Sequence, residues 1–261
     1  FVETDVNKTD MLPLVKGCDV VVCLAAITDA ASSFDQAERV EENNYNATRV
    51  LAEACAAAGT ALIFPSSTSV YGTQAAVVDE DCDESELKPQ SPYATSKLRE
   101  ERLIEELCRS QGLRAVICRF GTIYGVSPGM RFHTAVNKFC WQAVLGQPLT
   151  VWSSAYDQKR PYLDLLDCGR AIEFIIRQQL FDGRVYNVIT ANHTVREVVD
   201  TIRRSVQELE VSFVDSRIMN QLSYEVLCDR FRATGFEFSG DLGRGVRETM
   251  ALLRRANAAT A

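Results

Sequence analysis

Three continuous apolar runs restrict the fold of this chain more than any other feature. They occupy residues 19–26, 61–64 and 113–120, and each is followed by a segment with polar or glycine-rich character. A strand that is buried on both faces gives such a run, because neither face needs polar residues. Alternation of buried strands with helices of about 10–15 residues is typical of a parallel sheet covered by helices. The sequence therefore predicts an α/β fold with a doubly wound parallel sheet.

The remaining elements follow from apolar spacing and from glycines that end helices. We expect a short strand at residues 1–6, further strands at 149–152 and 184–189, a helical turn at 11–15, and helices at 40–58, 94–111, 136–144, 168–179, 195–209, 224–234 and 242–255. The pattern changes after Gly125. We therefore predict a sheet domain of residues 1–125 and 161–189, and a smaller, mostly helical lobe of residues 126–160 and 190–261.

Composition narrows the class of protein. With 261 residues and 46% hydrophobic content, the chain can bury a large core. A net charge of −7 argues against a general binder of nucleic acid or of anionic membranes, and no apolar run reaches the length of a membrane span. The nine cysteines lack CxxC spacing, which favours reduced thiols in the cytoplasm, and two histidines give no basis for a metal site. Because the chain begins at Phe1, without Met, we expect residues to precede it.

A cluster of polar residues follows the second apolar run. The segment Ser66–Gly72 lies where a parallel strand would end, and ligands bind at this edge of open α/β sheets. Tyr93 and Lys97 lie four residues apart at the start of a helical pattern, so both side chains share one helix face. A lysine ammonium beside a phenol favours the phenolate, which makes a tyrosine usable as a base near neutral pH. Ser67, Tyr93 and Lys97 are therefore the predicted catalytic group, although Tyr93 and Lys97 alone would also suit an ordinary exposed helix terminus.

With these residues in place, the chain resembles the extended short-chain dehydrogenase/reductase family, in particular its nucleotide-sugar epimerases and dehydratases. The motifs that carry the resemblance, in the family's order, are DVVVCLAA (19–26), NYNAT (44–48), SSTSVYG (66–72), YATSK (93–97), RFGTIYG (119–125), RPYLDLLD (160–167) and YNV (186–188). A YxxxK pattern alone arises by chance in many proteins, whereas seven motifs in order are specific. The resemblance implies a Rossmann-like dinucleotide-binding domain, a substrate-binding lobe and a homodimer formed by the helices at 40–58 and 94–111.

The resemblance also implies a cofactor site. Lys97 would bind the nicotinamide ribose as well as assist Tyr93, and Asp5 and Val6 would border the adenine. The full set that the resemblance assigns to NAD is Asp5, Val6, Leu24, Ala25, Ala26, Asn44, Ser66, Tyr93, Lys97, Phe120, Gly121 and Ile123. The family's glycine-rich phosphate loop and its acidic residue that selects NAD have no match in the sequence, so NADP is not excluded. We expect both features upstream of Phe1.

For the substrate, the resemblance implies a nucleotide sugar whose diphosphate meets Arg160, because a planar guanidinium suits phosphate oxygens. Thr68, Thr122 and Asn137 complete the predicted substrate site. Arg160 would otherwise pair with an aspartate of its own segment at the surface.

The chain departs from the family at two positions that bear on the reaction. Where the 4,6-dehydratases carry an Asp-Glu pair after the catalytic hydroxyl residue, this chain has Thr68 and Ser69, which disfavours dehydration. The sequence favours an NAD(P)-dependent nucleotide-sugar epimerase or a closely related oxidoreductase, in which Tyr93 removes a hydroxyl proton during hydride transfer and Ser67 holds the same oxygen. Two alternatives stay open. One is a non-catalytic Rossmann-like scaffold or binding protein, and the other is a dehydrogenase or reductase of a non-nucleotide alcohol or ketone.

Overall fold

The chain forms two compact units. The computed structural model describes residues 1–28, 32–72, 76–206, 208–215 and 224–260. Unit 1 comprises Phe1–Thr73, Glu80–Phe120 and Ile172–Asn187, and unit 2 comprises Gln74–Asp79, Gly121–Ala171 and Val188–Ala261. The chain therefore leaves unit 1 briefly at Gln74–Asp79, leaves it again after Phe120 and returns to it at Ile172. The assignment of the first unit as a cofactor domain and of the second as a substrate lobe remains a prediction.

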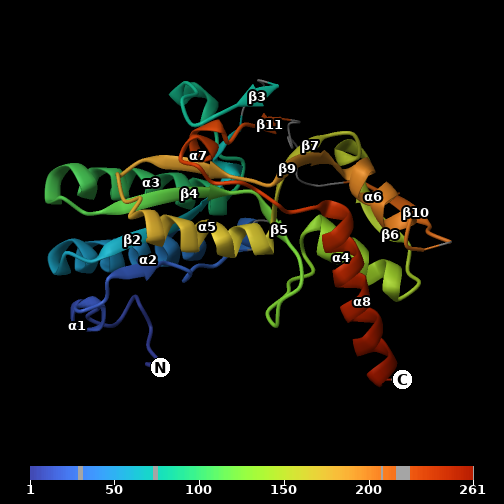
Figure 1. Ribbon diagram of the computed structural model, residues 1–261, viewed down its shortest axis with the longest axis horizontal. Helices are drawn as coiled ribbons and strands as arrows, with labels where there is room; N and C mark the ends of the chain where they lie inside the picture. Colours follow the sequence, from blue (N-terminus) through green and yellow to red (C-terminus); the bar gives the residue numbers. More distant parts are fainter. Residues whose placement is uncertain (29–31, 73–75, 207, 216–223, 261) are drawn as a thin grey trace. The chain divides into compact units, whose positions relative to one another are not determined.

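Unit 1 is built on a four-stranded sheet in the order β1-β2-β4-β8 (Figure 1). The strands are β1 (Val20–Val22), β2 (Ala61–Ser67), β4 (Ala115–Phe120) and β8 (Val185–Val188). β1 pairs with β2 in parallel, and β2 pairs with β4 in parallel. Every residue of β4 is buried, which is the state expected of a strand covered on both faces. The predicted α/β fold with a parallel sheet is confirmed.

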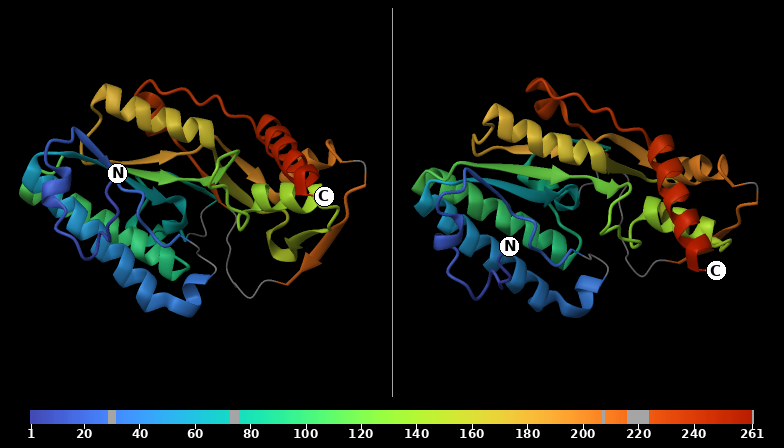
Figure 2. Two further views of the ribbon diagram at one scale, coloured as in Figure 1. Left: turned by 90° about the horizontal axis from the view of Figure 1, so that it is seen from below. Right: turned by 60° about the horizontal axis from the view of Figure 1, so that its bottom comes forward.

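Helices cover both faces of this sheet. On one face, α2 (Ala37–Ala58) and α3 (Pro92–Gln111) lie side by side. The part of α5 (Leu165–Gln178) that belongs to unit 1 lies on the other face (Figure 2). α2 and α3 each end at a glycine in the left-handed conformation, Gly59 with φ 70° and Gly112 with φ 68°, as the predicted glycine stops require.

The core of unit 1 lies between the sheet and the layer formed by α2 and α3. Phe64 and Ile117 contribute from the strands and are completely buried. Ala52 and Cys55 of α2 are also completely buried, and their small side chains let the helix approach the sheet closely. Burial of each large apolar side chain of this kind stabilises the fold by about 1.5–3 kcal/mol.

The sheet edge at β1 differs from the sequence-based expectation. Residues 1–6 form no strand, and the apolar run at 19–26 pairs only over Val20–Val22. β1 is the outermost strand on its side among the described residues, and residues 1–6 do not pair with its free edge or with another described strand. The strand prediction at residues 1–6 is wrong for this reason. The helical turn expected at 11–15 is present as α1 (Leu12–Val15).

Short single-turn elements connect the longer ones. They are 3₁₀ helices at Ser32–Gln36 (η1), Thr68–Val70 (η2), Glu84–Glu86 (η3) and Ser153–Ala155 (η4).

Unit 2 holds more strand than the sequence pattern predicts. One sheet has the order β5-β7-β9, in which β7 (Lys159–Asp164) pairs in parallel with β5 (Thr122–Tyr124) and antiparallel with β9 (Ala191–Thr194). Two further sheets pair β6 (Leu149–Trp152) with β10 (Val211–Val214), and β3 (Val77–Val78) with β11 (Glu225–Val226). The helix predicted over 224–234 starts as β11 and becomes helical only at α7 (Asp229–Ala233). The two residues of β11 give too short a period for recognition from sequence.

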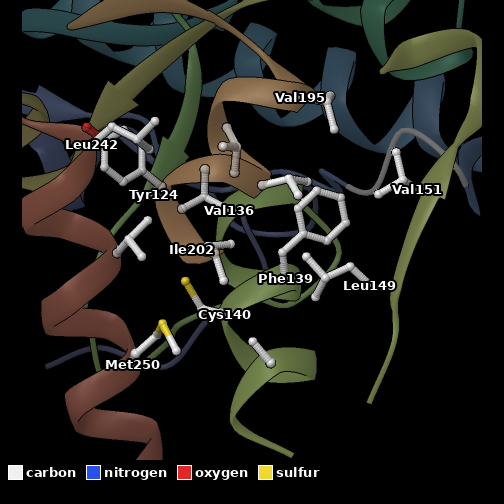
Figure 3. Close-up of a cluster of buried hydrophobic side chains, with 14 of the residues drawn as sticks. Tyr124, Val136, Phe139, Cys140, Leu149, Val151, Val195, Ile202, Leu242 and Met250 are labelled. Carbon is white, nitrogen blue, oxygen red and sulfur yellow. The ribbon is translucent and has the colours of Figure 1, made fainter. Parts of the chain in front are cut away.

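Three helices enclose the core of unit 2: α4 (Ala135–Val144), α6 (Val195–Arg203) and α8 (Leu242–Thr260). Phe139, Ile202 and Met250 come from these three helices and point into one apolar cluster (Figure 3). α6 ends at Arg203, six residues before its predicted end at Leu209. In the described part of the chain, no helix is long and apolar enough to cross a membrane.

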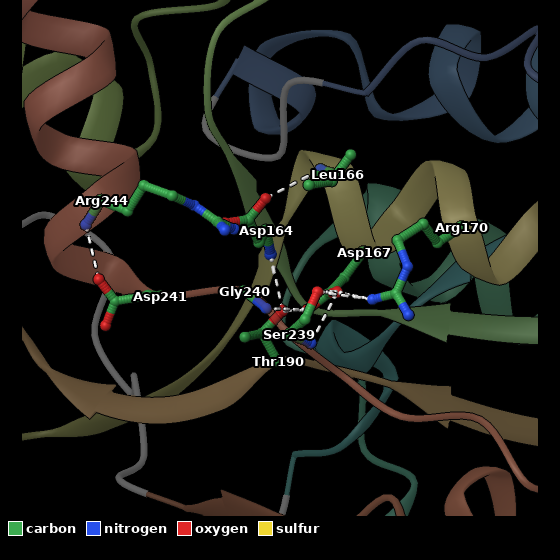
Figure 4. A network of polar contacts seen from close by, with 9 residues as sticks. All are labelled: Asp164, Leu166, Asp167, Arg170, Thr190, Ser239, Gly240, Asp241 and Arg244. Atoms are coloured by element: carbon green, nitrogen blue, oxygen red, sulfur yellow. Dashed lines mark hydrogen bonds and ion pairs between the residues drawn. The ribbon is translucent and has the colours of Figure 1, made fainter.

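A buried carboxylate fastens the segment before α8 to the start of α5 (Figure 4). Asp167 is completely buried and accepts hydrogen bonds from the backbone N–H groups of Ser239, at 3.0 Å, and Gly240, at 2.8 Å. The Thr190 hydroxyl and the Arg170 guanidinium also donate to it, at 2.8 and 2.9 Å. Although burial raises the pKa of Asp167, these donors together lower it below its ordinary value. The carboxylate therefore stays charged and joins three segments of unit 2.

Candidate active site

Ser67 ends β2 at the carboxyl edge of the sheet in unit 1. In the strand register it lies opposite Phe120, the last residue of β4. The Ser67 hydroxyl oxygen accepts the backbone N–H of Ser69 at 3.2 Å and so caps η2. Because that oxygen is an acceptor in this bond, the hydroxyl proton is available to a further acceptor.

Tyr93 and Lys97 lie in the first two turns of α3. Ser91 caps the helix by accepting the backbone N–H of Ala94 at 3.2 Å, and Pro92 takes the first helical position, where its missing N–H costs nothing. The helix expected over 94–111 is present and begins two residues earlier, at Pro92. Tyr93 and Lys97 share one helix face about one turn apart, Tyr93 half-buried and Lys97 only 3% exposed.

The ammonium of Lys97 lies between a carboxylate and an aromatic ring. Its Nζ is 3.2 Å from Oε2 of Glu100 and 4.5 Å from the ring centroid of Phe64 in β2. Glu100 is completely buried and also accepts the hydroxyls of Thr48, at 2.7 Å, and Ser96. Lys97 is thereby held against the strand that ends in Ser67.

A second buried network lies one residue further along α3. The guanidinium of Arg119 binds Glu101, with Nη2 2.7 Å from Oε2, and donates to the Tyr71 hydroxyl at 2.9 Å. Tyr71 donates to Asn187 at 3.0 Å, and the Ser66 hydroxyl donates to Glu101. Burial raises the pKa of Tyr71 far above the range of a base near neutral pH, although Arg119 opposes the shift. The network is therefore structural and includes the Ser66 hydroxyl, and the assignment of Ser66 to the cofactor site stays a prediction.

The loop after β1 carries the small residues that the sequence assigns to the cofactor. Leu24 is 72% exposed, Ala25 is exposed and Ala26 is half-buried. Asn44, completely buried in α2, holds this loop by accepting the N–H of Ile27 at 2.8 Å and donating to its carbonyl at 2.9 Å. Asn44 would therefore support the predicted cofactor site by holding the backbone of this loop.

Asp5 and Val6 occupy a turn instead of a strand. The exposed Asp5 pairs with Lys8 at 3.1 Å and accepts the N–H of Asn7 at 3.0 Å, and these two partners lower its pKa. Val6 packs at the margin of the unit 1 core. Their assignment to an adenine stays a prediction.

In unit 2, Arg160 lies in β7 next to an aromatic ring. Its guanidinium carbon is 5.6 Å from the ring centroid of Tyr224, and its nitrogens donate to Gln158 at 2.7 Å and to the Lys159 carbonyl at 2.9 Å. Burial lowers the pKa of Arg160, and the nearby tyrosines oppose this shift. The two aspartates of its segment have other ion-pair partners, since Asp167 binds Arg170 and Asp164 binds Arg244 (Figure 4).

The other predicted substrate residues differ in how their polar atoms are used. Asn137 is buried and holds a loop, accepting the N–H of Gly125 and donating to the Arg131 carbonyl, both at 3.2 Å. Thr68 is buried in unit 1 and donates to the Phe120 carbonyl at 3.3 Å. Thr122 is half-buried at the start of β5. The substrate-binding role of each of these residues remains a prediction.

The residues that the sequence assigns to the nicotinamide lie where β4 is followed by β5. Phe120 is buried, and Ile123 is 36% exposed. A Cβ atom at Gly121 would lie 3.0 Å from the Pro161 carbonyl oxygen and 3.0 Å from a methyl carbon of Ile189. Glycine is therefore needed there for close backbone approach. Over the described ranges, no group of three or more His, Cys, Asp and Glu side chains is arranged to hold a metal ion.

Comparison with known proteins places this arrangement in a family. The model of the NAD-dependent epimerase/dehydratase family matches residues 1–188, a span that includes both strand ends and the start of α3. The chain belongs to this family. This match confirms the resemblance inferred from the motifs. Residues 189–261 lie beyond the matched span.

Relatives of this chain include proteins named for a single reaction and proteins named for several. The uncharacterized UDP-glucose epimerase YtcB of Bacillus subtilis (strain 168) is 31% identical over 207 residues, covering 77% of this chain and 63% of YtcB. The trifunctional UDP-glucose 4,6-dehydratase/UDP-4-keto-6-deoxy-D-glucose 3,5-epimerase/UDP-4-keto-L-rhamnose-reductase RHM2 of Arabidopsis thaliana is 29% identical over 266 residues. The match covers 96% of this chain but 38% of RHM2, so the chain spans well under half the length of that relative.

Solved structures have the same fold. MoeE5 in complex with UDP-glucose and NAD superposes with a TM-score of 0.86 at 26% identity, covering 98% of this chain and 86% of that one. A UDP-glucuronic acid 4-epimerase from Bacillus cereus gives a TM-score of 0.88 at 24% identity, covering 98% and 82%. The Rossmann-like assignment of the epimerase/dehydratase chain rests on these likenesses and on the sheet order of unit 1.

Sequence reasoning missed the buried partners of Lys97. Glu100 follows Lys97 by three residues, a helical spacing that places both on one face, and this signal was available in the sequence. Thr48 lies on α2, which reaches α3 only through tertiary packing. No local sequence pattern could therefore have predicted the hydrogen bond from Thr48 to Glu100.

Proposed function

We propose that this protein is an NAD(P)-dependent nucleotide-sugar epimerase, or a closely related oxidoreductase, with Tyr93 as its base. The observation that carries the proposal is the start of α3. There Tyr93 and Lys97 share a helix face, and Lys97 is buried against the strand that ends in Ser67. An ordinary exposed helix terminus, the alternative for this pair, would not bury the ammonium.

The chemistry of the three side chains fits removal and return of a proton at a carbinol oxygen. Tyr93 takes the proton of a sugar hydroxyl, and the Lys97 ammonium favours the phenolate that this requires. Ser67 has its oxygen occupied by the Ser69 N–H, so its proton is directed to the same substrate oxygen. Return of the proton by Tyr93, after the ketone has turned over in the site, is the proton half of an epimerisation, whose hydride half would be supplied by the bound cofactor.

The residues that would hold NAD are chemically suited to a dinucleotide. Leu24 and Ala25 are exposed, the small side chains of Ala25 and Ala26 leave the backbone after β1 accessible, and Asn44 fixes that loop. Lys97 would contact the ribose, and Phe120 and Gly121 would border the nicotinamide. When bound, the cofactor supplies the hydride acceptor. NAD is favoured over NADP because the solved relatives MoeE5 and the Bacillus cereus epimerase are complexes with NAD.

Epimerisation is favoured over 4,6-dehydration by the residues that follow Ser67. Relatives of both kinds occur, and dTDP-D-glucose 4,6-dehydratase of Mus musculus is 25% identical over 269 residues. Loss of water needs an acid and a base besides the tyrosine, and Thr68 and Ser69 supply neither. The Thr68 hydroxyl is moreover engaged with the Phe120 carbonyl. These two residues support the epimerase or reductase branch.

A nucleoside diphosphate sugar is the proposed substrate, because Arg160 offers a planar guanidinium beside the Tyr224 ring and solved relatives hold UDP sugars. We further propose a homodimer formed by the outer faces of α2 and α3, as the family resemblance implies. Scattered cysteines without CxxC spacing support a cytoplasmic setting.

The Tyr93→Phe variant tests the proposal. With the ring kept and the acidic hydroxyl removed, kcat on a panel of UDP and dTDP sugars should fall by about 10²–10⁴, the usual contribution of a positioned base. Binding of NAD, measured by calorimetry, should persist. The matched control is Tyr186→Phe, whose hydroxyl donates to Asp182 at 2.6 Å and takes no part in the proposed chemistry. Turnover by Tyr93→Phe close to that of the unmodified enzyme would refute the assignment.

A further inference from the structure

Glu100 is a buried charge that the proposed chemistry does not use. It is completely buried, on the helix that carries Tyr93 and Lys97. Its carboxylate receives three donors, the Lys97 ammonium at 3.2 Å, the Thr48 hydroxyl at 2.7 Å and the Ser96 hydroxyl. A buried carboxylate with three donors is fixed in position, and its charge acts in a medium that screens poorly.

The surroundings of the Lys97–Glu100 pair come from several segments of unit 1. The Phe64 ring faces Lys97 from β2, and Thr48 faces Glu100 from α2. Cys23, just after β1, is buried within electrostatic reach of both, since burial raises the pKa of its thiol, Lys97 lowers it and Glu100 raises it. On α3 itself, the next carboxylate, Glu101, is paired with Arg119 of β4. Glu100 is therefore the carboxylate that the structure pairs with the lysine.

We propose that Glu100 is a positioning residue of the candidate site, whose carboxylate holds the Lys97 ammonium against β2 and weakens the attraction of that ammonium for the Tyr93 phenolate. This inference rests on the proposed function, because it concerns how strongly Lys97 assists Tyr93. It makes the basicity of the catalytic tyrosine depend on α2 as well, through the hydrogen bond from Thr48 to Glu100.

The sign of the effect follows from the charges. An ammonium near a phenol favours the phenolate, and a carboxylate near a phenol disfavours it. Glu100 lies beside the ammonium, so it cancels part of the favourable field at Tyr93. Removal of the carboxylate charge should therefore make Tyr93 lose its proton at lower pH, provided that Lys97 stays in place. Loss of the Thr48 hydroxyl should act in the opposite direction, because the carboxylate charge is then shared with one donor fewer.

The test compares Glu100→Gln with Glu100→Asp in the holoenzyme. Glutamine keeps the length and the acceptor oxygen but removes the charge, whereas aspartate keeps the charge and shortens the side chain. The readout is the alkaline titration of Tyr93, taken as the tyrosinate absorbance of each protein minus that of the same protein with Tyr93→Phe. We expect the midpoint to fall by about one pH unit in Glu100→Gln, as a unit charge at this range implies, and to stay nearly unchanged in Glu100→Asp.

A purely structural role predicts a different pattern, in which Glu100→Asp disturbs the titration as much as Glu100→Gln. That pattern, or a midpoint that is unchanged or higher in Glu100→Gln, would overturn the inference. Thr48→Val provides an independent variant with the opposite expected sign, a higher midpoint, should Glu100→Gln fail to fold. An unchanged or lower midpoint in Thr48→Val would count against the inference in the same way.

The pH dependence of turnover separates this inference from the proposed function. The acidic limb of the kcat profile should shift to lower pH in Glu100→Gln, in parallel with the titration. If Tyr93→Phe abolishes turnover and the limb does not move, Tyr93 is the base but Glu100 does not tune it. If Tyr93→Phe remains active, the proposed function itself fails, whatever the titration shows.

Discussion

At the scale of single residues, the two adjacent glutamates of α3 have separate tasks. Glu100 pairs with Lys97 of its own helix, whereas Glu101 pairs with Arg119 of β4. Burial would lower the pKa of Arg119, but Glu101 and Tyr71 raise it well above the ordinary value. In sequence, a pair of glutamates in a helix is typical of a solvated face, and only the cations that meet them in the fold reveal two buried ion pairs.

The Arg119–Glu101 pair should be a large contribution to the stability of unit 1. The variant Glu101→Gln leaves the Arg119 guanidinium, whose side chain is 5% exposed, without its counter-charge, and should lower the free energy of unfolding by about 3–5 kcal/mol. The control is Glu106→Gln, which breaks the surface pair with Arg109 and should cost less than about 1 kcal/mol, because those side chains are 60% and 72% exposed. Urea denaturation followed by circular dichroism measures both, and equal losses would contradict the assignment of Glu101.

At the scale of elements, the joint between α5 and the segment before α8 depends on a glycine. A Cβ atom at Gly240 would lie 2.4 Å from the Cβ of Asp164 and 2.7 Å from Oδ2 of Asp167, closer than real Cβ contacts (Figure 4). Gly240→Ala should therefore displace the N–H that donates to Asp167 and lower the melting temperature of the protein by several degrees, as a loss of about 2 kcal/mol would.

Gly169 of α5 is the matched control for this prediction, because a Cβ atom there meets nothing within 4 Å. Gly169→Ala should leave the melting temperature unchanged or raise it slightly, since alanine favours the helix by about 1 kcal/mol. Calorimetric scans of the two variants at one pH separate them. A melting temperature for Gly240→Ala equal to that of Gly169→Ala would show that the joint tolerates a side chain.

Elements with strong local signals were predictable from the sequence, and those that depend on partners were not. The apolar runs and the glycine stops at Gly59 and Gly112 led to the central strands and to both long helices of unit 1. The strand expected at residues 1–6 failed because backbone pairing needs a neighbour, and β11 was missed because two residues carry no periodicity. The start of α3 was predictable because Ser91, Pro92 and the following pattern are local.

At the scale of the whole molecule, the predicted roles divide between the two units. Ser67, Tyr93 and Lys97 belong to unit 1, whereas Arg160 belongs to unit 2. The sequence motifs identified these residues. The residues that hold the site in place, such as Thr48, which donates to Glu100, come from distant segments and could be identified only from the fold. If proton transfer belongs to the first unit and substrate anchoring to the second, variants in the two units should affect different kinetic constants.

The variant Arg160→Lys tests this division. Lysine keeps the positive charge but loses the planar, two-pronged donor, so it should bind a diphosphate less well by about 1.5–3 kcal/mol. We therefore expect KM for the nucleotide sugar, and Kd for UDP alone measured by calorimetry, to rise about 10–100-fold, while kcat changes by less than about threefold. Arg196→Lys is the control, because Arg196 pairs with Asp157 on the surface. A large fall in kcat with unchanged UDP binding would instead assign Arg160 to the chemical step and contradict the division between the units.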